Sequence, residues 1–157
     1  GTIKRGQTEE EDQELKIKLF NDPKERAENV MIVDVVRNDL SRVARRASVK
    51  VDELYGVYTF KTVHHLVSTV SARLKKEVHP VDAIKASFPM ASMTGAPKIR
   101  AMKIIEESED FKRGLYSGAF GCFMPNGDFD FNVIIRSILY NEKNKMLSFP
   151  VGGAITA

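Results

Sequence analysis

The sequence predicts a mixed α/β fold with antiparallel strands. Two helix-forming segments occupy the first third of the 157 residues, alternating segments follow, and three apolar stretches joined by turn residues end the chain. Short turns favour antiparallel pairing, because a parallel return needs a crossover of a dozen or more residues. With 43% hydrophobic residues and no linker long enough to divide it, the chain is expected to form one domain or a large part of one.

Two helices are expected near the N-terminus. Thr8 and Glu11 have the Thr-x-x-Glu spacing of a capping box, which predicts a helix that extends to about Phe20. A break follows at Pro23, which suits the first turn of a second helix. The apolar spacing of that helix continues to about Val43.

The middle of the chain predicts strands and then a short helix. Residues 49–58 favour short strands around Gly56, and residues 62–74 alternate as a long strand does. Pro80 begins a short helix that extends through Ala86.

The last part of the chain predicts a helix followed by three antiparallel strands. The helix covers residues 97–107, and its expected buried stripe consists of Ile99, Met102, Ile104 and Ile105. The expected strands cover residues 115–123, 130–140 and 145–149. Turns at Asn126-Gly127 and at residues 141–144 would join them.

Composition argues against two classes of protein. The chain has 24 basic and 21 acidic residues and a formal net charge of +3, which is close to balance. A basic cluster at Arg42, Arg45 and Arg46 has no interleaved aromatic residues, so we expect a solvated helix face there and no nucleic-acid partner. No apolar run reaches the roughly 18 residues that a membrane helix needs, so no membrane partner is expected either.

The single cysteine, Cys122, lies in an apolar run and cannot form an internal disulfide. We expect it to be a small buried apolar residue. A lone free thiol fits a reducing compartment, so the sequence predicts a cytoplasmic protein.

Glu25 and Glu28 are three residues apart on the second helix, so their carboxylates share one face. A divalent ion with oxygen ligands would relieve their repulsion, and magnesium needs only one or two protein carboxylates. The alternative is structural, because acids in a first helical turn favour the helix dipole and Lys24 and Arg26 lie beside Glu25.

His64 and His65 are neighbours on an expected strand, so their rings point to opposite faces. A core histidine that donates to a backbone carbonyl is one interpretation. A general acid that works near neutral pH is the other.

Two further features suit an anionic ligand. Residues 92–98, Ser-Met-Thr-Gly-Ala-Pro-Lys, place hydroxyls and a cation at the start of a helix, where anions bind, although a simple loop and cap is the alternative. Arg136 lies in an apolar run and needs a partner, which is either Asp128 or Asp130 or a substrate carboxylate.

In their order and spacing, these segments resemble the C-terminal catalytic part of the chorismate-utilising enzymes, which include aminodeoxychorismate synthase component I, anthranilate synthase component I, and isochorismate and salicylate synthases. The resemblance covers essentially all 157 residues. The segments that carry it are Gly1-Thr2 with Arg5-Gly6, residues 27–34 with Arg37-Asn38-Asp39-Leu40, His65-Leu66-Val67-Ser68, residues 92–98, residues 113–118, and Ile135-Arg136.

The resemblance implies antiparallel sheets packed face to face with helices outside. It places Glu25 and Glu28 at magnesium-binding positions, His65 near the departing 4-hydroxyl group of chorismate, and Ser92 in the substrate pocket as a second catalytic position. The positions that match substrate-binding residues are Tyr116, Arg136, Gly152 and Gly153.

The resemblance also implies a reaction and a partner. Residues 92–95 and 130–133 are more similar to the aminodeoxychorismate branch, in which chorismate and ammonia give 4-amino-4-deoxychorismate for folate synthesis. Anthranilate, isochorismate and salicylate synthases are the alternatives within the family, and a non-enzymatic anion-binding module is the alternative from another class. Ammonia would come from a glutamine amidotransferase subunit.

The chain departs from the family pattern in three respects. Ala91 and Ala154 stand where the family usually has glycine. Two further magnesium-associated glutamates would follow Ala157, and the residue before Gly1 is lysine in aminodeoxychorismate synthases and alanine in anthranilate synthases. The chain begins abruptly and stops on a glycine-rich turn, so we expect residues 1–157 to be the C-terminal part of a single catalytic domain, inactive by itself.

Overall fold

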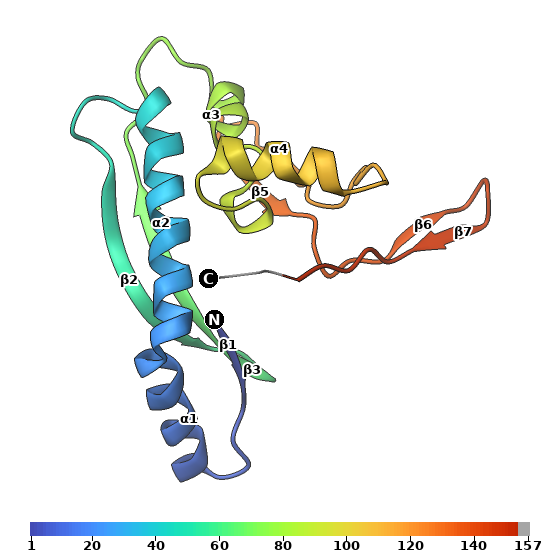
Figure 1. Ribbon diagram of the computed structural model, residues 1–157. Coiled ribbons are helices and arrows are strands. Elements are labelled where there is room, and N and C mark those ends of the chain that lie inside the picture. The colour runs from blue at the N-terminus through green and yellow to red at the C-terminus, as the bar shows by residue number, and fades with distance from the viewer. Residues whose placement is uncertain (154–157) are drawn as a thin grey trace. The chain divides into compact units, whose positions relative to one another are not determined.

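The computed structural model describes residues 1–153. The chain divides into two compact units, Gly1–Met102 and Lys103–Ala157. Helices and antiparallel strands occur in both (Figure 1), so the predicted mixed α/β class is confirmed. Face-to-face packing of the sheets would join strands of different units, and it stays a prediction, as does the assignment of the chain to a single domain.

The first unit contains the two predicted N-terminal helices, α1 (Glu9–Asn21) and α2 (Pro23–Val43). Thr8 caps α1, because its hydroxyl accepts a hydrogen bond from the backbone N–H of Glu11 at 3.2 Å. The Glu11 carboxylate accepts from the backbone N–H of Gln7, one residue earlier than a capping box requires. Asp22 caps α2 in the same way, and Pro23 occupies its first turn.

The sheet of the first unit has the strand order β1-β3-β2, and both pairs are antiparallel. Its strands are β1 (Thr2–Lys4), β2 (Lys50–Thr59) and β3 (Val63–Ser71). The long strand predicted over residues 62–74 is therefore confirmed. The short strands predicted around Gly56 form one strand instead, whose register shifts on the approach to this residue.

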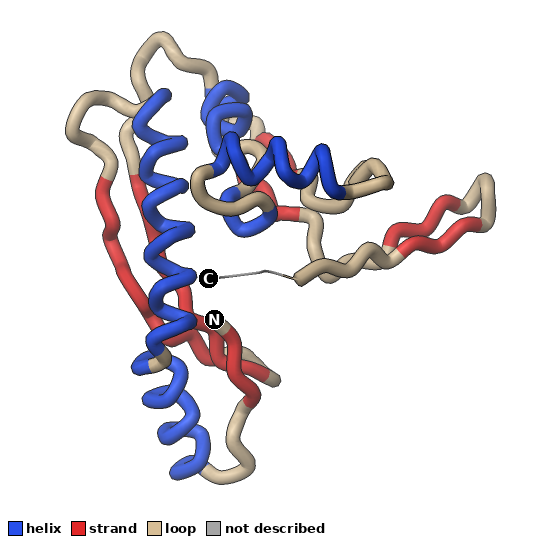
Figure 2. The backbone as a smooth tube through the Cα atoms, viewed as in Figure 1, coloured by secondary structure: helices blue, strands red, loops and turns tan. Residues whose placement is uncertain are grey.

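Both helices cover this sheet, and α2 runs beside β2 and β3 (Figure 2). Apolar residues from each layer are buried, including Leu19 of α1, Val33 of α2 and Leu66 of β3. A Cβ atom added to Gly1 would lie only 2.9 Å from the Cβ of Leu66, so the chain enters β1 through a gap that only glycine fits.

The first unit continues with α3 (Pro80–Ser87) and the short 3₁₀ helix η1 (Ala91–Met93), and α4 (Lys98–Ser108) crosses into the second unit. The α3 helix begins at the predicted proline. The buried stripe predicted for α4 was wrong, because Ile99 and Ile104 are 57% and 45% exposed. None of the residues of α4 is buried, although Met102 and Ile105 are half-buried.

In residues 103–153 the second unit forms two hairpins. They pair β4 (Ala119–Phe123) with β5 (Phe129–Val133) and β6 (Leu139–Asn141) with β7 (Met146–Ser148). Both predicted turns are confirmed, and Gly127 has the positive φ of 90° that its turn requires. The strand predicted over residues 130–140 divides in two, because Arg136 adopts a left-handed backbone with a φ of 50°.

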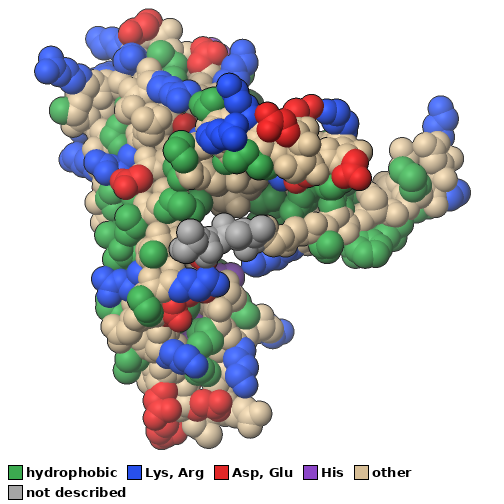
Figure 3. Space-filling model, viewed as in Figure 1, with side chains coloured by type: hydrophobic (Ala, Val, Ile, Leu, Met, Phe, Trp, Pro, Cys, Tyr) green, Lys and Arg blue, Asp and Glu red, His purple; other side chains and the backbone are tan. Residues whose placement is uncertain are grey.

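Apolar side chains remain exposed on these hairpins. Phe120 on β4 is 75% exposed, and Tyr140 and Leu147 on the second hairpin are 59% and 54% exposed. Hydrophobic side chains, in green, are visible on the surface of the arm that β6 and β7 form (Figure 3). Cys122 is exposed as well, so the prediction that it is buried was wrong. A two-stranded hairpin has too little apolar surface to cover both of its own faces.

The structure also contains no helix, among residues 1–153, with the length and apolar character needed to cross a membrane.

Candidate functional site

The two predicted metal ligands, Glu25 and Glu28, lie one turn apart at the start of α2. Their side chains are 27% and 31% exposed. Glu25 Oε2 lies 3.2 Å from the nitrogen of Gly1, and Glu28 Oε1 lies 3.7 Å from Lys24 Nζ. The backbone N–H of Glu25 also donates to Asp22, the cap of the helix. The shared face is confirmed, and partial exposure leaves both carboxylates accessible to solvent.

The donor atoms fit magnesium as part of a ligand set. Carboxylate oxygens are its preferred protein ligands, and the ion retains several waters when one or two carboxylates bind it. Across residues 1–153, no cluster of three or more His, Cys, Asp or Glu side chains offers a complete protein cage. Glu25 and Glu28 therefore suit an open, water-rich site, and magnesium binding itself stays a prediction.

His65 lies on β3 directly opposite Thr2 of β1. Its Nδ1 lies 2.8 Å from the Thr2 hydroxyl, and its ring packs edge-on against Phe60, with 5.3 Å between the ring centroids. Its Nε2 has no hydrogen-bond partner among the residues that the structure describes. A histidine fixed through Nδ1 keeps Nε2 available for proton transfer.

His64 points to the other side of the strand and is completely buried, so the predicted opposition of the two rings is confirmed. Its Nε2 lies 2.9 Å from Asp12 Oδ1, and its Nδ1 lies 3.0 Å from the Thr59 hydroxyl. The expectation of a backbone carbonyl partner was wrong, because a carboxylate and a hydroxyl occupy both ring nitrogens.

Asp12 is the residue that sequence reasoning missed. Its Oδ1 accepts hydrogen bonds from Arg5 Nε at 2.7 Å and from the backbone N–H of Gly6 at 2.8 Å, in addition to His64. The Arg5 guanidinium, more than the backbone and histidine donors, holds the pKa of this carboxyl well below its usual range. In the sequence Asp12 is one of four acids in the first turn of a helix, a pattern that the helix dipole already explains.

Residues 92–98 are only partly available for an anion. Ser92 is exposed in η1. The Lys98 ammonium donates to Asp39 Oδ2 at 2.7 Å and to the carbonyl of Ser87 at 3.0 Å. Lys98 and Asp39 are 10% and 3% exposed, so the cation expected to attract a ligand is neutralised by a carboxylate. Ala91, where the family usually has glycine, is buried.

Tyr116 and Gly152 lie together in the second unit. A Cβ atom added to Gly152 would overlap the Tyr116 hydroxyl, whereas one added to Gly153 would meet no atom of the described residues. The Arg113 guanidinium also lies 5.8 Å from the centre of the Tyr116 ring. Two of the predicted substrate-binding residues therefore adjoin, and Ala154 lies outside the described residues.

Arg136 is exposed and lies beyond the end of β5, so its expected burial within a strand was wrong. Ser117 N–H donates to the carbonyl of Ile134 at 3.0 Å, which places Tyr116 and Arg136 at the same end of the β4–β5 hairpin. Asp128 lies at the turn of this hairpin and bonds to Asn126. Neither Asp128 nor Asp130 forms an ion pair with Arg136 within residues 1–153, and an exposed guanidinium needs no such partner, so binding of a substrate carboxylate by Arg136 stays a prediction.

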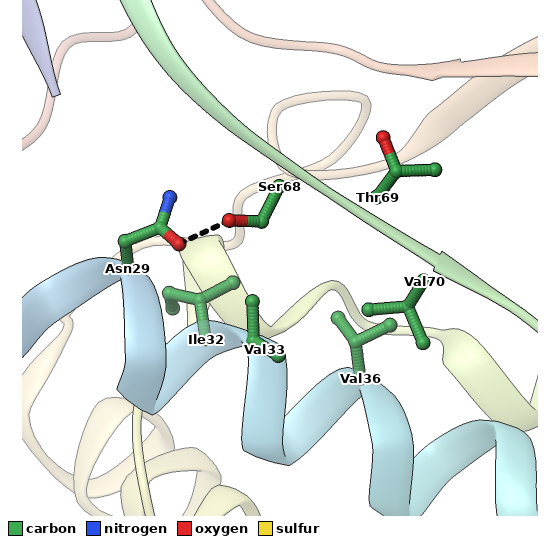
Figure 4. A pocket seen from close by; sticks show the side chains of 7 residues that line it. All are labelled: Asn29, Ile32, Val33, Val36, Ser68, Thr69 and Val70. Carbon is green, nitrogen blue, oxygen red and sulfur yellow. Dashed lines mark hydrogen bonds between the residues drawn. The ribbon is translucent and has the colours of Figure 1, made fainter. Parts of the chain in front are cut away.

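A cavity of about 390 Å³ lies between α2 and β3 (Figure 4). Ser68 Oγ in its wall donates to Asn29 Oδ1 at 2.5 Å and accepts from the backbone N–H of Tyr55 at 3.1 Å. The other lining residues are Ile32, Val33, Val36, Thr69 and Val70. None of the eight predicted site residues lines this cavity, so we do not assign the substrate to it.

The contact between Tyr116 and Gly152 leads to a prediction for Gly152→Ala. The added methyl group would displace the Tyr116 hydroxyl. If Tyr116 binds the substrate as the resemblance implies, we expect a rise in KM for that substrate of about tenfold, the effect of losing about one good hydrogen bond to a charged group. Steady-state kinetics of the complete enzyme would measure it. Gly153→Ala, which meets open space, is the matched control, and an equal rise in both variants would contradict the proposed contact.

Comparison with known proteins identifies the family. The chain matches the chorismate binding enzyme family over residues 1–157. It is 48% identical over its whole length to a chloroplastic aminodeoxychorismate synthase of Arabidopsis thaliana and 45% identical to aminodeoxychorismate synthase component 1 of Escherichia coli, covering 17% and 34% of those proteins. The chain belongs to the chorismate binding enzyme family, and it spans between a sixth and about a third of the length of these relatives.

A solved structure supports the fold. The crystal structure of anthranilate synthase component I from Streptococcus pneumoniae is 45% identical in sequence, with a TM-score of 0.76 over 82% of this chain and 30% of that one. Glu25, Glu28, His65 and Ser92 belong to the first unit, and the four substrate-binding candidates belong to the second. Their convergence on one site therefore stays a prediction.

Proposed function

We propose that this chain is part of component 1 of an aminodeoxychorismate synthase, which converts chorismate and ammonia into 4-amino-4-deoxychorismate and water for folate synthesis. The observation that carries the proposal is the 48% identity to an aminodeoxychorismate synthase over all 157 residues. Anthranilate synthase is the second candidate, because the Streptococcus pneumoniae enzyme is 45% identical.

The geometry of the first unit suits the departure of the 4-hydroxyl group. In the proposed reaction a C–N bond forms to ammonia, the C–O bond of the ring breaks, and the leaving oxygen takes up a proton. His65 would donate that proton from Nε2, because Thr2 occupies Nδ1. The exposed Ser92 hydroxyl would contact the substrate as well.

Charge neutralisation explains the remaining assignments. Glu25 and Glu28 would hold magnesium, which when bound supplies positive charge for the ring carboxylate of chorismate. Arg136 and Tyr116 would bind the enolpyruvyl carboxylate, one by charge and one through its hydroxyl. The backbone N–H groups of Gly152 and Gly153 would donate to a carboxylate as well.

A partner and a location complete the proposal. The name of the Escherichia coli relative, component 1, implies a second component, and we propose that a glutamine amidotransferase subunit supplies the ammonia. We also propose a cytoplasmic location, on the grounds of the single free thiol. The relative from Arabidopsis thaliana is chloroplastic by name, so the location differs among such enzymes.

An assay of the complete enzyme with chorismate, magnesium and an ammonium salt tests this function. We expect 4-amino-4-deoxychorismate as the product, detected as p-aminobenzoate after a lyase is added. Fluorescent anthranilate formed without a lyase would overturn the first candidate in favour of the second. Salt-sensitive binding of DNA or RNA without conversion of chorismate would instead indicate an anion-binding module.

The same assay tests the two glutamates. Because each carboxylate would be a direct ligand, we expect Glu25→Gln and Glu28→Gln to raise the magnesium concentration needed for half-maximal activity by about 10- to 100-fold or more. Excess magnesium would partly restore the rate. The control is Glu14→Gln, an exposed glutamate of α1. An unchanged magnesium requirement in both variants would remove these residues from the metal site.

A further inference from the structure

His64 and Asp12 lie in the first unit next to the proposed general acid, yet the proposed reaction gives them no task. We propose that His64, held by Asp12 and Thr59, is the positioning residue that orients His65. This inference rests on the proposed function, because it concerns the same reaction.

The hydrogen-bond network fixes the ring of His64 completely. Asp12 stays ionised at neutral pH because Arg5 lowers the pKa of its carboxyl group, so its oxygen can only accept. His64 must therefore donate from Nε2, and in the neutral ring Nδ1 accepts from the Thr59 hydroxyl. Asp12 also faces Lys16, whose Nζ is 3.9 Å from Oδ2.

Neighbouring side chains on a strand point in opposite directions, so a strand anchored on one face is also oriented on the other. His64 has no exposed surface and uses both ring nitrogens. Rotation of β3 that tilted His65 would therefore pull His64 away from Asp12 and leave the Nε2 donor of a buried imidazole without its acceptor. The free-energy cost of that loss holds the His65 ring in its orientation.

A second connection joins the same network to the ring of His65. Arg5 Nε donates to Asp12 Oδ1, and Arg5 Nη1 donates to the carbonyl of Phe60 at 3.0 Å. The ring of Phe60 packs edge-on against His65. The Arg5 guanidinium thus links Asp12, which holds His64, to Phe60, which packs against His65. Thr2, opposite His65, completes the restraint on the ring.

Two substitutions of His64 separate orientation from simple folding. Gln keeps a side-chain N–H close to the place of Nε2, so His64→Gln retains a donor for Asp12, whereas His64→Leu retains the bulk and removes both hydrogen bonds. The matched control is His79→Gln. His79 is exposed and caps α3 through Nδ1, away from this network. All three would be made in the complete enzyme and assayed with chorismate, magnesium and an ammonium salt.

A misplacement of about 1 Å can reduce a rate by about 100-fold. We therefore expect His64→Leu to lower kcat by about 10- to 100-fold while KM for chorismate changes by less than about twofold, since His65 acts in the chemical step. His64→Gln should recover most of the rate, and His79→Gln should match the parent enzyme. Melting temperatures of all variants show whether each remains folded at the assay temperature.

Three outcomes overturn the proposal. The first is a folded His64→Leu variant that keeps the parental kcat. The second is a fall in kcat in both His64 variants that simply follows the fall in their melting temperatures, and the third is a rise in KM while kcat stays constant. Failure of the proposed function is distinct, because the parent enzyme would then make no aminodeoxychorismate. If the parent makes anthranilate instead, the same comparison of kcat still applies, since both reactions remove the 4-hydroxyl group.

Discussion

Replacement of Lys98 by Met is expected to destabilise the protein by about 3–5 kcal/mol, the cost of removing one partner from a buried ion pair. Lys98 and Asp39 are 10% and 3% exposed, and their charged atoms lie 2.7 Å apart. Loss of the ammonium leaves the Asp39 carboxylate buried without its partner and also frees the carbonyl of Ser87. The connection between α2 and the start of α4 is lost with them.

Chemical denaturation of the complete enzyme would measure this loss, and Lys103→Met supplies the control. Lys103 is exposed on the same helix, so its replacement should change the free energy of unfolding by less than about 0.5 kcal/mol. The double variant Asp39→Leu with Lys98→Met should lose less than the sum of the single changes, because neither side chain then carries an unpaired charge. Equal losses for Lys98→Met and Lys103→Met would refute the structural role.

The local part of the fold could be predicted from the sequence because its causes are local. Thr8 and Pro23 determine helix starts through contacts within a few residues, and the turn at Gly127 depends on its own backbone freedom. The short strand β1 could not be predicted, since three residues give no periodic signal and its pairing with β3 joins Thr2 to His65, 63 residues away.

Failures of prediction arose where tertiary surroundings decide. The run around Arg136 alternates as a strand does, but its left-handed backbone interrupts the strand. Helical spacing suggested that Ile99 is buried, and an apolar run suggested the same for Cys122, yet both are exposed, because burial depends on the tertiary surroundings.

In the candidate site, too, local features could be predicted and tertiary contacts could not. Sequence motifs placed Glu25 and Glu28 on one helical face and His65 opposite His64, because both statements follow from periodicity alone. The hydrogen-bond and ion-pair partners found in the structure could not be predicted in this way. Asp12 is 52 positions from His64, and Asp39 is 59 positions from Lys98, so neither pair has a signature in the sequence.

Replacement of Asp12 by Asn is expected to lower the melting temperature near neutral pH by several degrees, because Arg5, Gly6 and His64 all donate to the ionised Oδ1 of Asp12. The amide of Asn has nearly the same shape, so the loss reports the charge. Arg5 would retain its position with a weaker acceptor.

The stability that Asp12 contributes should decrease as the pH falls. The folded state holds the pKa of Asp12 below its usual range, whereas the unfolded state has a value of about 3.9. The contribution of Asp12 is therefore fully present above that unfolded value and is lost as pH falls below it toward the lower folded value. The parent enzyme should lose its advantage over Asp12→Asn progressively below about pH 4.

Melting curves of both proteins from about pH 7 to about pH 3 would test this, with Asp34→Asn as control. Asp34 pairs with Arg37 on the exposed side of α2 at 2.9 Å, and exposed pairs of this kind contribute little. A constant difference between the parent and Asp12→Asn across this range would show that Asp12 does not stabilise the fold through its charge. A difference that shrinks with acid for Asp12→Asn alone would show that the ionised carboxylate holds Arg5 and His64 in place.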